Sequence, residues 1–314
     1  MLKLDARDFI MPYFVIEGVN KREPVVSMPG IARLSIDNLL KDVSRSQGLG
    51  LKAVLLFGVC PEVRKDEKAG YGYSAQGIVQ KATAEIKQKL KDITVITDVC
   101  LCAYIRHGHC GILKKSKLQG KIQNFCIDSE KTLETLAKIA LSHAEAGADW
   151  VAPSAMAKGQ VLAIRKSLDA HGFKKVKILG YSAKFASNFY GPFREAADSA
   201  PQFGDRSAYQ LDYADKKAPL KEIAQDIKEG ADMVMVKPAL SYLDVIRDAK
   251  ARFSYPLAAY NTSGEYTIVK LGARQGLWDE KRMAAEVITS IKRAGADFII
   301  TYHANDLARW RIVK

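Results

Sequence analysis

Three of the five cysteines in this chain, Cys100, Cys102 and Cys110, fall within eleven residues, a spacing that could hold a metal ion. Cysteine thiolates bind zinc, and three protein ligands leave the fourth tetrahedral position open, as a catalytic zinc site requires. The alternative is a group of buried structural cysteines. Cys60 and Cys126 are interpreted as packing residues, because an odd total and this clustering do not suggest a disulfide framework.

Two lysines stand at or near the ends of short apolar runs, where strands are expected to finish. Lys237 directly follows residues 233–236, and Lys184 comes three residues after residues 177–181. Burial and a second nearby ammonium both lower the pKa of a lysine and free its amine as a nucleophile. Either lysine alone could instead extend its ammonium to solvent. Two of them on adjacent strands favour Schiff-base chemistry on a carbonyl.

Residues 185–215 contain too many Gly, Pro and aromatic residues for a plain connection between strands. We predict that this segment forms a lid over the active site. Arg194 and Arg206 within it could bind a carboxylate in bidentate fashion. The alternative is that both arginines form surface ion pairs.

Eight short, nearly continuous apolar runs recur along the chain and indicate buried strands. They are residues 13–16, 53–57, 94–97, 149–152, 177–181, 232–236, 257–260 and 298–301. Amphipathic stretches of helical length lie between them, at residues 132–145, 161–170, 219–229, 243–252 and 283–293. This alternation predicts parallel strands, and eight of them favour a single (β/α)8 TIM barrel over residues 1–314 rather than a doubly wound sheet. No Gly-x-Gly-x-x-Gly follows any run, which weakens the dinucleotide-binding alternative.

In such barrels the active site lies at the C-terminal ends of the strands. Polar or nucleophilic residues follow six of the predicted strands, so we expect them at one mouth. In chain order they are Asp98, Ser154, Lys184, Lys237, Ser263 and Tyr302.

The composition is that of a globular protein, with 48% hydrophobic and 26% charged residues over 314 positions. The N-terminus lacks the apolar stretch of a secretory signal, and no apolar run reaches the roughly 18–20 residues of a membrane span, so a cytoplasmic protein without a membrane partner is expected. The net charge of +13 would concentrate anionic substrates. Nucleic acid is not an expected partner, because the basic stretches 114–117 and 174–177 lack interleaved aromatic residues.

Several long segments together resemble the porphobilinogen synthase (5-aminolevulinate dehydratase) family. The matching segments are residues 27–30 (SMPG), 98–111 (DVCLCAYIRHGHCG), 181–194 (YSAKFASNFYGPFR), 204–206 (GDR), 235–238 (MVKP), 260–266 (YNTSGEY) and 293–297 (RAGAD). The resemblance runs from about Met11 to the end of the chain. It implies a barrel enzyme that condenses two molecules of 5-aminolevulinate into porphobilinogen with loss of two waters, in tetrapyrrole (heme) biosynthesis.

The resemblance also implies roles for individual residues. Lys237 would form the Schiff base with the substrate that becomes the propionate side, and Lys184 the one with the acetate side. Asp98 and Ser154 would assist proton transfer and positioning. The zinc-dependent type is implied, with the metal held by Cys100, Cys102 and Cys110.

The same resemblance assigns the substrate-binding residues. One substrate carboxylate would be bound by Arg194, Arg206 and Gln210. The other would be bound by Ser263 and Tyr302, while Tyr190 and Tyr260 would line the pocket.

The chain departs from the family pattern in a few places. The family usually has a longer N-terminal arm that embraces a neighbouring subunit, whereas here residues 1–11 are the only expected remnant. A homo-oligomer is expected, either the octamer that is usual in the family or, because the arm is short, a dimer or other smaller assembly. Glu222 matches an allosteric magnesium ligand of some members, but its surroundings differ. Lys158 replaces a common aspartate, and Thr262 a common valine.

Two other functions fit parts of this pattern. A Schiff-base aldolase on the same barrel would need one lysine and would have no use for the three cysteines. A non-catalytic relative that binds nucleic acid or protein would show salt-sensitive binding.

Overall fold

The computed structural model describes residues 3–115 and 125–312, which contain a closed barrel of eight parallel strands. Neighbouring strands pair in the order β1, β4, β5, β8, β9, β10, β11 and β12, and β12 pairs with β1 to close the barrel. Their bounds are β1 Phe9–Val15, β4 Ala53–Gly58, β5 Thr94–Val99, β8 Trp150–Pro153, β9 Lys177–Lys184, β10 Met233–Lys237, β11 Leu257–Asn261 and β12 Phe298–Thr301. The predicted TIM barrel is confirmed, and each predicted run overlaps one barrel strand.

The first barrel strand begins earlier than predicted. β1 starts at Phe9, so Phe9–Met11, which we had assigned to the N-terminal arm, pair with β12 and β4. Pro12 lies inside the strand, opposite Leu55. A proline lacks the N–H that a central strand uses for hydrogen bonding, so the sequence predicted that the strand begins after Pro12. The structure places the start of the strand three residues before it.

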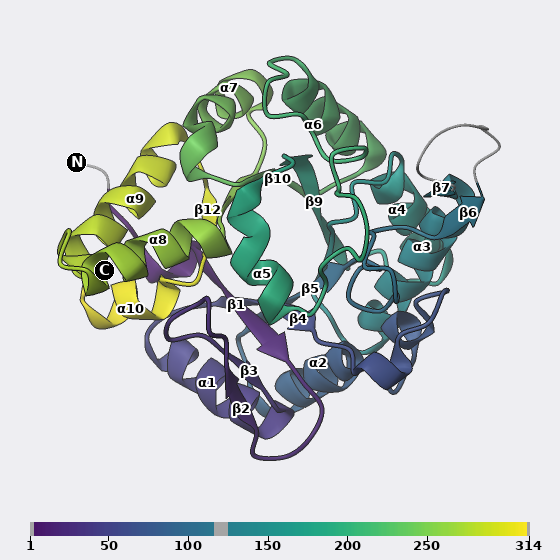
Figure 1. Ribbon diagram of the computed structural model, residues 1–314, viewed down its shortest axis with the longest axis horizontal. Helices are drawn as coiled ribbons and strands as arrows, with labels where there is room; N and C mark the ends of the chain where they lie inside the picture. The colour runs from purple at the N-terminus through teal and green to yellow at the C-terminus, as the bar shows by residue number, and fades with distance from the viewer. Residues whose placement is uncertain (1–2, 116–124, 313–314) are drawn as a thin grey trace.

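Helices separate the successive strands and surround the barrel (Figure 1). The α-helices are α1 Ile36–Gly48, α2 Ile78–Lys89, α3 Ser129–Glu145, α4 Gln160–Ala170, α5 Gly191–Ala196, α6 Ala218–Glu229, α7 Leu243–Phe253, α8 Ser263–Arg274, α9 Glu280–Ala294 and α10 Ala304–Arg309. Short 3-10 helices are η1 Ala6–Asp8, η2 Glu62–Arg64, η3 Gly70–Tyr73, η4 Asn188–Tyr190 and η5 Leu240–Tyr242. Four short strands form two hairpins outside the barrel: β2 Arg22–Pro24, β3 Ala32–Leu34, β6 Leu113–Lys115 and β7 Phe125–Ile127.

The strands have two buried faces, which explains why their sequences are continuous apolar runs rather than alternating ones. On β10, Met233 and Met235 point into the barrel interior, while Val234 and Val236 pack against the surrounding helices. Each fully buried side chain of this size stabilises the fold by about 1.5–3 kcal/mol relative to leaving it exposed.

An irregularity in β9 sets the position of one predicted catalytic lysine. Val234 pairs with Gly180 and Val236 with Ala183, so β9 contains one more residue than β10 over this interval. Because successive strand residues alternate between faces, this bulge lets both Tyr181 and Lys184 point inward. Lys184 then pairs directly with Lys237.

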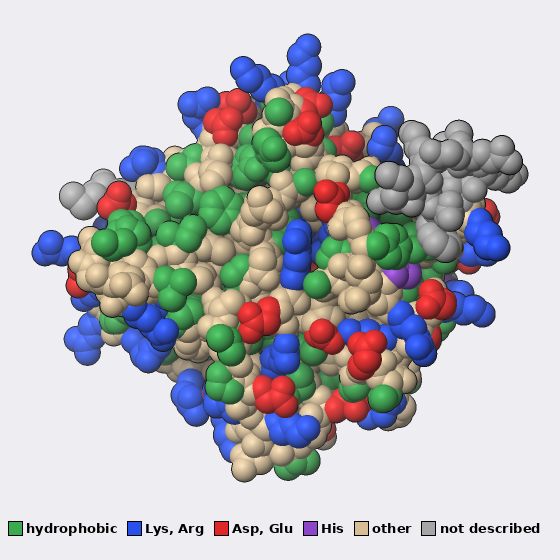
Figure 2. All heavy atoms as spheres, viewed as in Figure 1, with side chains coloured by type: hydrophobic (Ala, Val, Ile, Leu, Met, Phe, Trp, Pro, Cys, Tyr) green, Lys and Arg blue, Asp and Glu red, His purple; other side chains and the backbone are tan. Residues whose placement is uncertain are grey.

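Helix α5 and the segment around it lie across the centre of the barrel (Figure 1). On the face seen in Figure 2, Lys and Arg side chains lie mainly around the periphery, interspersed with Asp and Glu. Of the predicted basic stretch 114–117, the last two residues lie outside the described part of the chain, as do residues 1 and 2 of the expected arm. No described helix combines the length and the apolarity needed to cross a membrane.

Candidate active site

Lys184 and Lys237 end two adjacent strands and are both buried, with 6% and 5% of their surfaces exposed. The ammonium of Lys184 donates a hydrogen bond to the backbone oxygen of Ser154 at 2.5 Å. The Nζ atom of Lys237 lies 4.0 Å from the ring centre of Tyr260 and 5.0 Å from that of Tyr181. Burial, followed by the charge of Lys184, holds the pKa of Lys237 well below its usual range. Both effects favour the neutral amine, which is the form that attacks a carbonyl.

The three clustered cysteines come together beyond the end of β5. Their sulfur atoms all lie within 4.8 Å of one another and all three residues are buried. The loop can close because Gly108 has φ +70° and approaches the lid segment, where a Cβ would lie 2.2 Å from the Ala200 oxygen. The structure thus forms the predicted cluster.

The donor chemistry of this cluster fits a soft divalent metal ion. Hydrogen bonds from the other two thiols lower the pKa of Cys110 well below its usual value, and the positive charges of Arg206 and Lys184 act in the same direction. Thiolate is the form that binds a metal. Three sulfur ligands leave room for a fourth, non-protein ligand in a tetrahedral zinc site.

Asp98 is the next-to-last residue of β5, and Ser154 directly follows the neighbouring strand β8. Burial raises the pKa of Asp98 to about 6, against the lowering effects of Lys184, Ser154 and Lys237. Its Oδ1 atom has no hydrogen-bond partner among the described residues. A carboxyl group that titrates near neutral pH beside two lysines can accept or donate a proton during a reaction.

The three residues expected to bind one carboxylate all lie in the predicted lid segment and are at least partly buried. Arg194 is half-buried, while Arg206 and Gln210 are buried. Arg206 donates to the backbone oxygen of Gly108 at 2.9 Å. Among the described residues, neither arginine forms an ion pair, and neither the Nε atoms of the two arginines nor the amide atoms of Gln210 have a partner. Buried polar groups without partners are where a ligand is expected.

The other predicted binding residues lie in two places. Tyr302 and Tyr260 point into the barrel interior, with their hydroxyl oxygens 3.1 Å apart. Ser263 begins α8, where its Oγ accepts from the Phe193 N–H at 3.0 Å and donates to the Phe189 oxygen at 3.1 Å. Ser263 therefore contacts the lid segment, whereas the two tyrosines line the interior.

Tyr190 also belongs to the lid segment. Its hydroxyl donates to the backbone oxygen of Lys237 at 3.0 Å, and its ring centre lies 5.3 Å from the Lys237 Nζ. This side chain therefore lies beside Lys237, as the family resemblance implied.

Phe193, which sequence reasoning did not single out, lies at the centre of the mouth. Its ring centre lies 5.1 Å from the Lys237 Nζ and 4.9 Å from the ring centre of Phe57. The cavity between Phe193, Asp98 and the cysteines measures about 10 Å³. That space holds about one water molecule. The only sequence signal for Phe193 was its position in a segment, residues 185–215, that is rich in aromatic residues.

Two basic residues, which were also not predicted, contact residues 195–198 of the predicted lid segment. Arg33 donates to the backbone oxygens of Glu195 and Ala196, at 2.5 and 2.8 Å. Lys65 is 7% exposed and contacts the Asp198 carboxylate at 2.7 Å. Both lie more than 130 residues from the lid in sequence, so no local pattern could reveal them.

Comparison with known proteins matches nearly the whole chain to one family. Residues 2–310 match the family described as "Delta-aminolevulinic acid dehydratase". The chain belongs to this family. The delta-aminolevulinic acid dehydratase of Synechocystis sp. is 50% identical over 307 residues, which are 98% of this chain and 92% of the relative. The Bacillus subtilis protein of that name is 48% identical over 308 residues, with the same two shares.

A solved structure of the dehydratase family has the same fold. It is the delta-aminolevulinic acid dehydratase (porphobilinogen synthase) of Toxoplasma gondii, in complex with the reaction product porphobilinogen. The two structures align with a TM-score of 0.92 at 40% identity, over 98% of this chain and 85% of the other.

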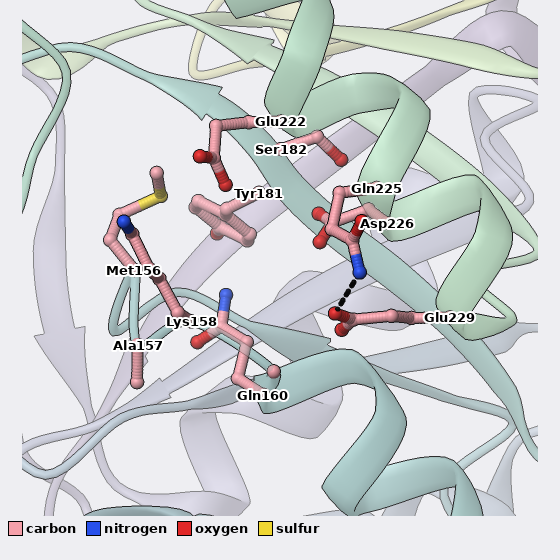
Figure 3. A pocket seen from close by; sticks show the side chains of 11 residues that line it. Met156, Ala157, Lys158, Gln160, Tyr181, Ser182, Glu222, Gln225, Asp226 and Glu229 are labelled. Carbon is pink, nitrogen blue, oxygen red and sulfur yellow. Dashed lines mark hydrogen bonds between the residues drawn. The ribbon is translucent and has the colours of Figure 1, made fainter. Parts of the chain in front are cut away.

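Glu222, which matches the position of a magnesium ligand in some dehydratase-family members, lines a separate cavity of about 230 Å³ between α4 and α6 (Figure 3). Both oxygens of neighbouring Glu229 already accept hydrogen bonds, from the side chain of Gln225 and the backbone of Leu162. Burial raises the pKa of Asp226 to about 7, so its carboxyl titrates near neutral pH. Among the described residues, these carboxylates do not bring three possible metal ligands together, as the cysteines do.

Lys158 occupies the ridge between two cavities. It is exposed and lines both the Glu222 cavity and a second cavity of about 440 Å³, which also contains His109, Cys110 and Cys126. The positive charge of Lys158 thus shares a cavity with Cys110 of the cysteine cluster, and neither Lys184 nor Lys237 lines that cavity.

Proposed function

We propose that this chain condenses two molecules of 5-aminolevulinate into porphobilinogen and releases two waters. The observation that carries the proposal is the pair of buried lysines, one of them with a strongly lowered pKa, beside three clustered cysteines. Membership of the dehydratase family supports it, as does the likeness to a protein solved with porphobilinogen.

In the proposed mechanism, the Lys237 amine attacks the ketone of the first substrate, and loss of water gives an imine. Lys184 forms the corresponding imine with the second substrate, with loss of a second water. Once protonated to an iminium, each imine makes its carbon more electrophilic than the ketone, and the lysine amine is released again when the ring closes. The overall reaction therefore consumes two keto acids, releases two waters and returns both lysines unchanged.

Proton transfers in this mechanism fall to Asp98, with Ser154 next to it. The carboxylate removes a proton from substrate carbon or nitrogen and returns it to the departing oxygen. Its pKa of about 6 suits both directions near neutral pH, because a catalytic group works best when its pKa is near the working pH.

The two substrate carboxylates would be bound at opposite sides of the site. Arg194, Arg206 and Gln210 have unpartnered polar atoms that could bind one of them. Ser263 and Tyr302 would bind the other, after Ser263 exchanges its contact with the lid for the substrate. Tyr190 and Tyr260 would shield the imines from water.

Cys100, Cys102 and Cys110 would hold a zinc ion as its three protein ligands. When bound, zinc would supply a Lewis acid with an open position for the second substrate. A Schiff-base aldolase would not require these cysteines.

We also propose that residues 185–215 act as a lid. The cavity that Phe193 lines beside Asp98, Cys100 and Cys102 holds about one water molecule, which supports movement of the segment when substrates enter. Ring contacts of Phe193 and the polar contacts of Arg33 and Lys65 would close it again.

The test is formation of porphobilinogen from 5-aminolevulinate by the purified protein, with and without a zinc chelator. We expect activity that chelation removes and added zinc restores. Activity that is indifferent to chelation would reject the zinc role and keep the reaction. No product with any metal, at any pH, would reject the proposed function.

A further inference from the structure

Glu265 is a buried carboxylate at the start of α8, with 2% of its surface exposed. Its Oε2 atom accepts hydrogen bonds from the backbone N–H and the hydroxyl of Thr262, at 2.5 and 2.6 Å. Its Oε1 atom accepts from the backbone N–H groups of Ala239 and Leu240, at 3.2 and 2.5 Å. One carboxylate thus binds donors from two separate loops.

These two loops carry residues of the site. Ala239 comes two positions after Lys237, and Thr262 directly precedes Ser263. The bonds to Thr262 form an ordinary capping box, which needs one carboxylate oxygen. The bonds from Ala239 and Leu240 span 25 or more residues of sequence and have no part in capping α8. Glu265 therefore ties the end of β10 to the end of β11.

The lid segment rests on the same two elements. Ser263 contacts Phe189 and Phe193, and a Cβ at Gly264 would lie 2.6 Å from the Phe189 oxygen. The Tyr190 hydroxyl donates to the Lys237 oxygen. A short series of contacts around Glu265 thus joins the predicted lid segment, Lys237 and the start of α8.

We propose that Glu265 is a positioning residue that holds Lys237 at a fixed distance from the start of α8 and the lid that rests on it. The proposal rests on the proposed function, because it concerns the geometry of the imine-forming amine. A carboxylate is needed here since all four of its partners are donors, and a neutral amide would turn its own N–H groups toward two of them.

The experiment compares Glu265→Gln with Glu229→Gln, a matched control. Glu229 is also a buried carboxylate that accepts from a side chain and a distant backbone N–H, but it lies between α4 and α6. Glu265→Asp is the second variant, because its shorter chain cannot reach both loops and it retains the charge. Porphobilinogen kinetics, thermal unfolding, borohydride trapping at Lys237 and amide hydrogen exchange are measured on the full chain.

For both Glu265 variants we expect kcat to fall at least tenfold, KM to rise at least threefold, and less adduct to be trapped at Lys237. Exchange should accelerate at the amides of Ala239, Leu240 and Thr262. Glu229→Gln should keep kcat and KM within twofold of the parent at a comparable loss of Tm. Equal kinetic losses in the control, or Glu265 variants within twofold of the parent, would overturn the proposal.

Failure of the proposed function would be seen separately, as a parent protein that makes no porphobilinogen. The exchange measurement still decides the positioning role in that case. Unchanged exchange at the three amides in Glu265→Gln would reject it, and faster exchange confined to the two loops would support it.

Discussion

Two regions of the molecule bury several titratable side chains: the mouth of the barrel and the cavity between α4 and α6. At the mouth, Lys237 is surrounded by aromatic rings, and the polar atoms of Gln210 have no partner among the described residues. In the α4–α6 cavity, both oxygens of Glu229 are hydrogen-bonded. Burial alone therefore does not distinguish an active site. What marks the mouth is that several polar atoms without a described partner, from Arg194, Arg206 and Gln210, gather there, whereas Gln160 Oε1 at the α4–α6 cavity is an isolated one.

The largest effect on activity is expected from removing the amine of Lys237. Lys237→Ala should abolish porphobilinogen formation and the borohydride-trapped adduct at this position, because no other group can form that imine. Mass spectrometry of the trapped peptide measures both. Lys270→Met is the control, since Lys270 is also largely buried but is ion-paired with Glu280 and Asp306. Near-normal turnover in Lys237→Ala would show that the imine assignment is wrong.

The cysteine cluster should give the next largest effect. Cys102→Ser should lower activity about 100-fold or more at limiting zinc, because one of three metal ligands is lost. Metal content after dialysis, measured by mass spectrometry, should fall with it. Cys126→Ser, at the exposed cysteine of β7, is the matched control and should keep its metal. Equal metal content in both variants would contradict the predicted site.

A pH effect should separate Asp98 from the other groups at the mouth. The pKa of this carboxyl is raised to about 6, so it gains a proton, and loses its function as a base, as the pH falls through 6. We expect kcat/KM of the parent to fall below pH 6. Asp98→Asn should lower kcat about 100-fold and abolish the fall of kcat/KM below pH 6. If the variant shows the same fall below pH 6, the titrating group is not Asp98.

The α4–α6 cavity should affect stability rather than catalysis. Asp226 has a folded-state pKa of about 7, above its unfolded value near 3.8, so its contribution to stability is lost as the pH rises from about 4 to 7. Asp226→Asn should therefore raise the free energy of unfolding at pH 8, by roughly 2–4 kcal/mol, and much less at pH 4. Urea denaturation at both pH values measures this.

Glu222→Gln, in the same cavity, should change kcat less than twofold with or without magnesium. A large loss of activity in either cavity variant would remove the contrast between the two regions.

Much of the barrel was predictable because its strands are buried on both faces and so produce continuous apolar runs. The start of β1 was missed because Pro12 interrupts the pattern, and α8 was missed because Ser263 and Gly264 at its start are poor helix formers. The capping box of Thr262 and Glu265 was a readable signal for α8. It would also have drawn attention to Glu265.

For the site, the two lysines and three cysteines could be inferred from type and spacing. The roles of Gln210 and Ser263 came only from the family resemblance. Arg33 and Lys65 could not be found at all, because they meet the lid only after the chain folds. Contacts between residues far apart in sequence leave no local pattern to recognise.

The extra residue in β9 has a consequence for which sequence changes this site can tolerate. β9 has two residues, Tyr181 and Ser182, where β10 has only Met235. Deleting one of the two would make β9 a regular strand, in which Lys184 still faces the interior opposite Lys237, because the faces then alternate without interruption. A single deletion in this interval should therefore preserve the lysine pair, whereas replacement of Lys184 removes it.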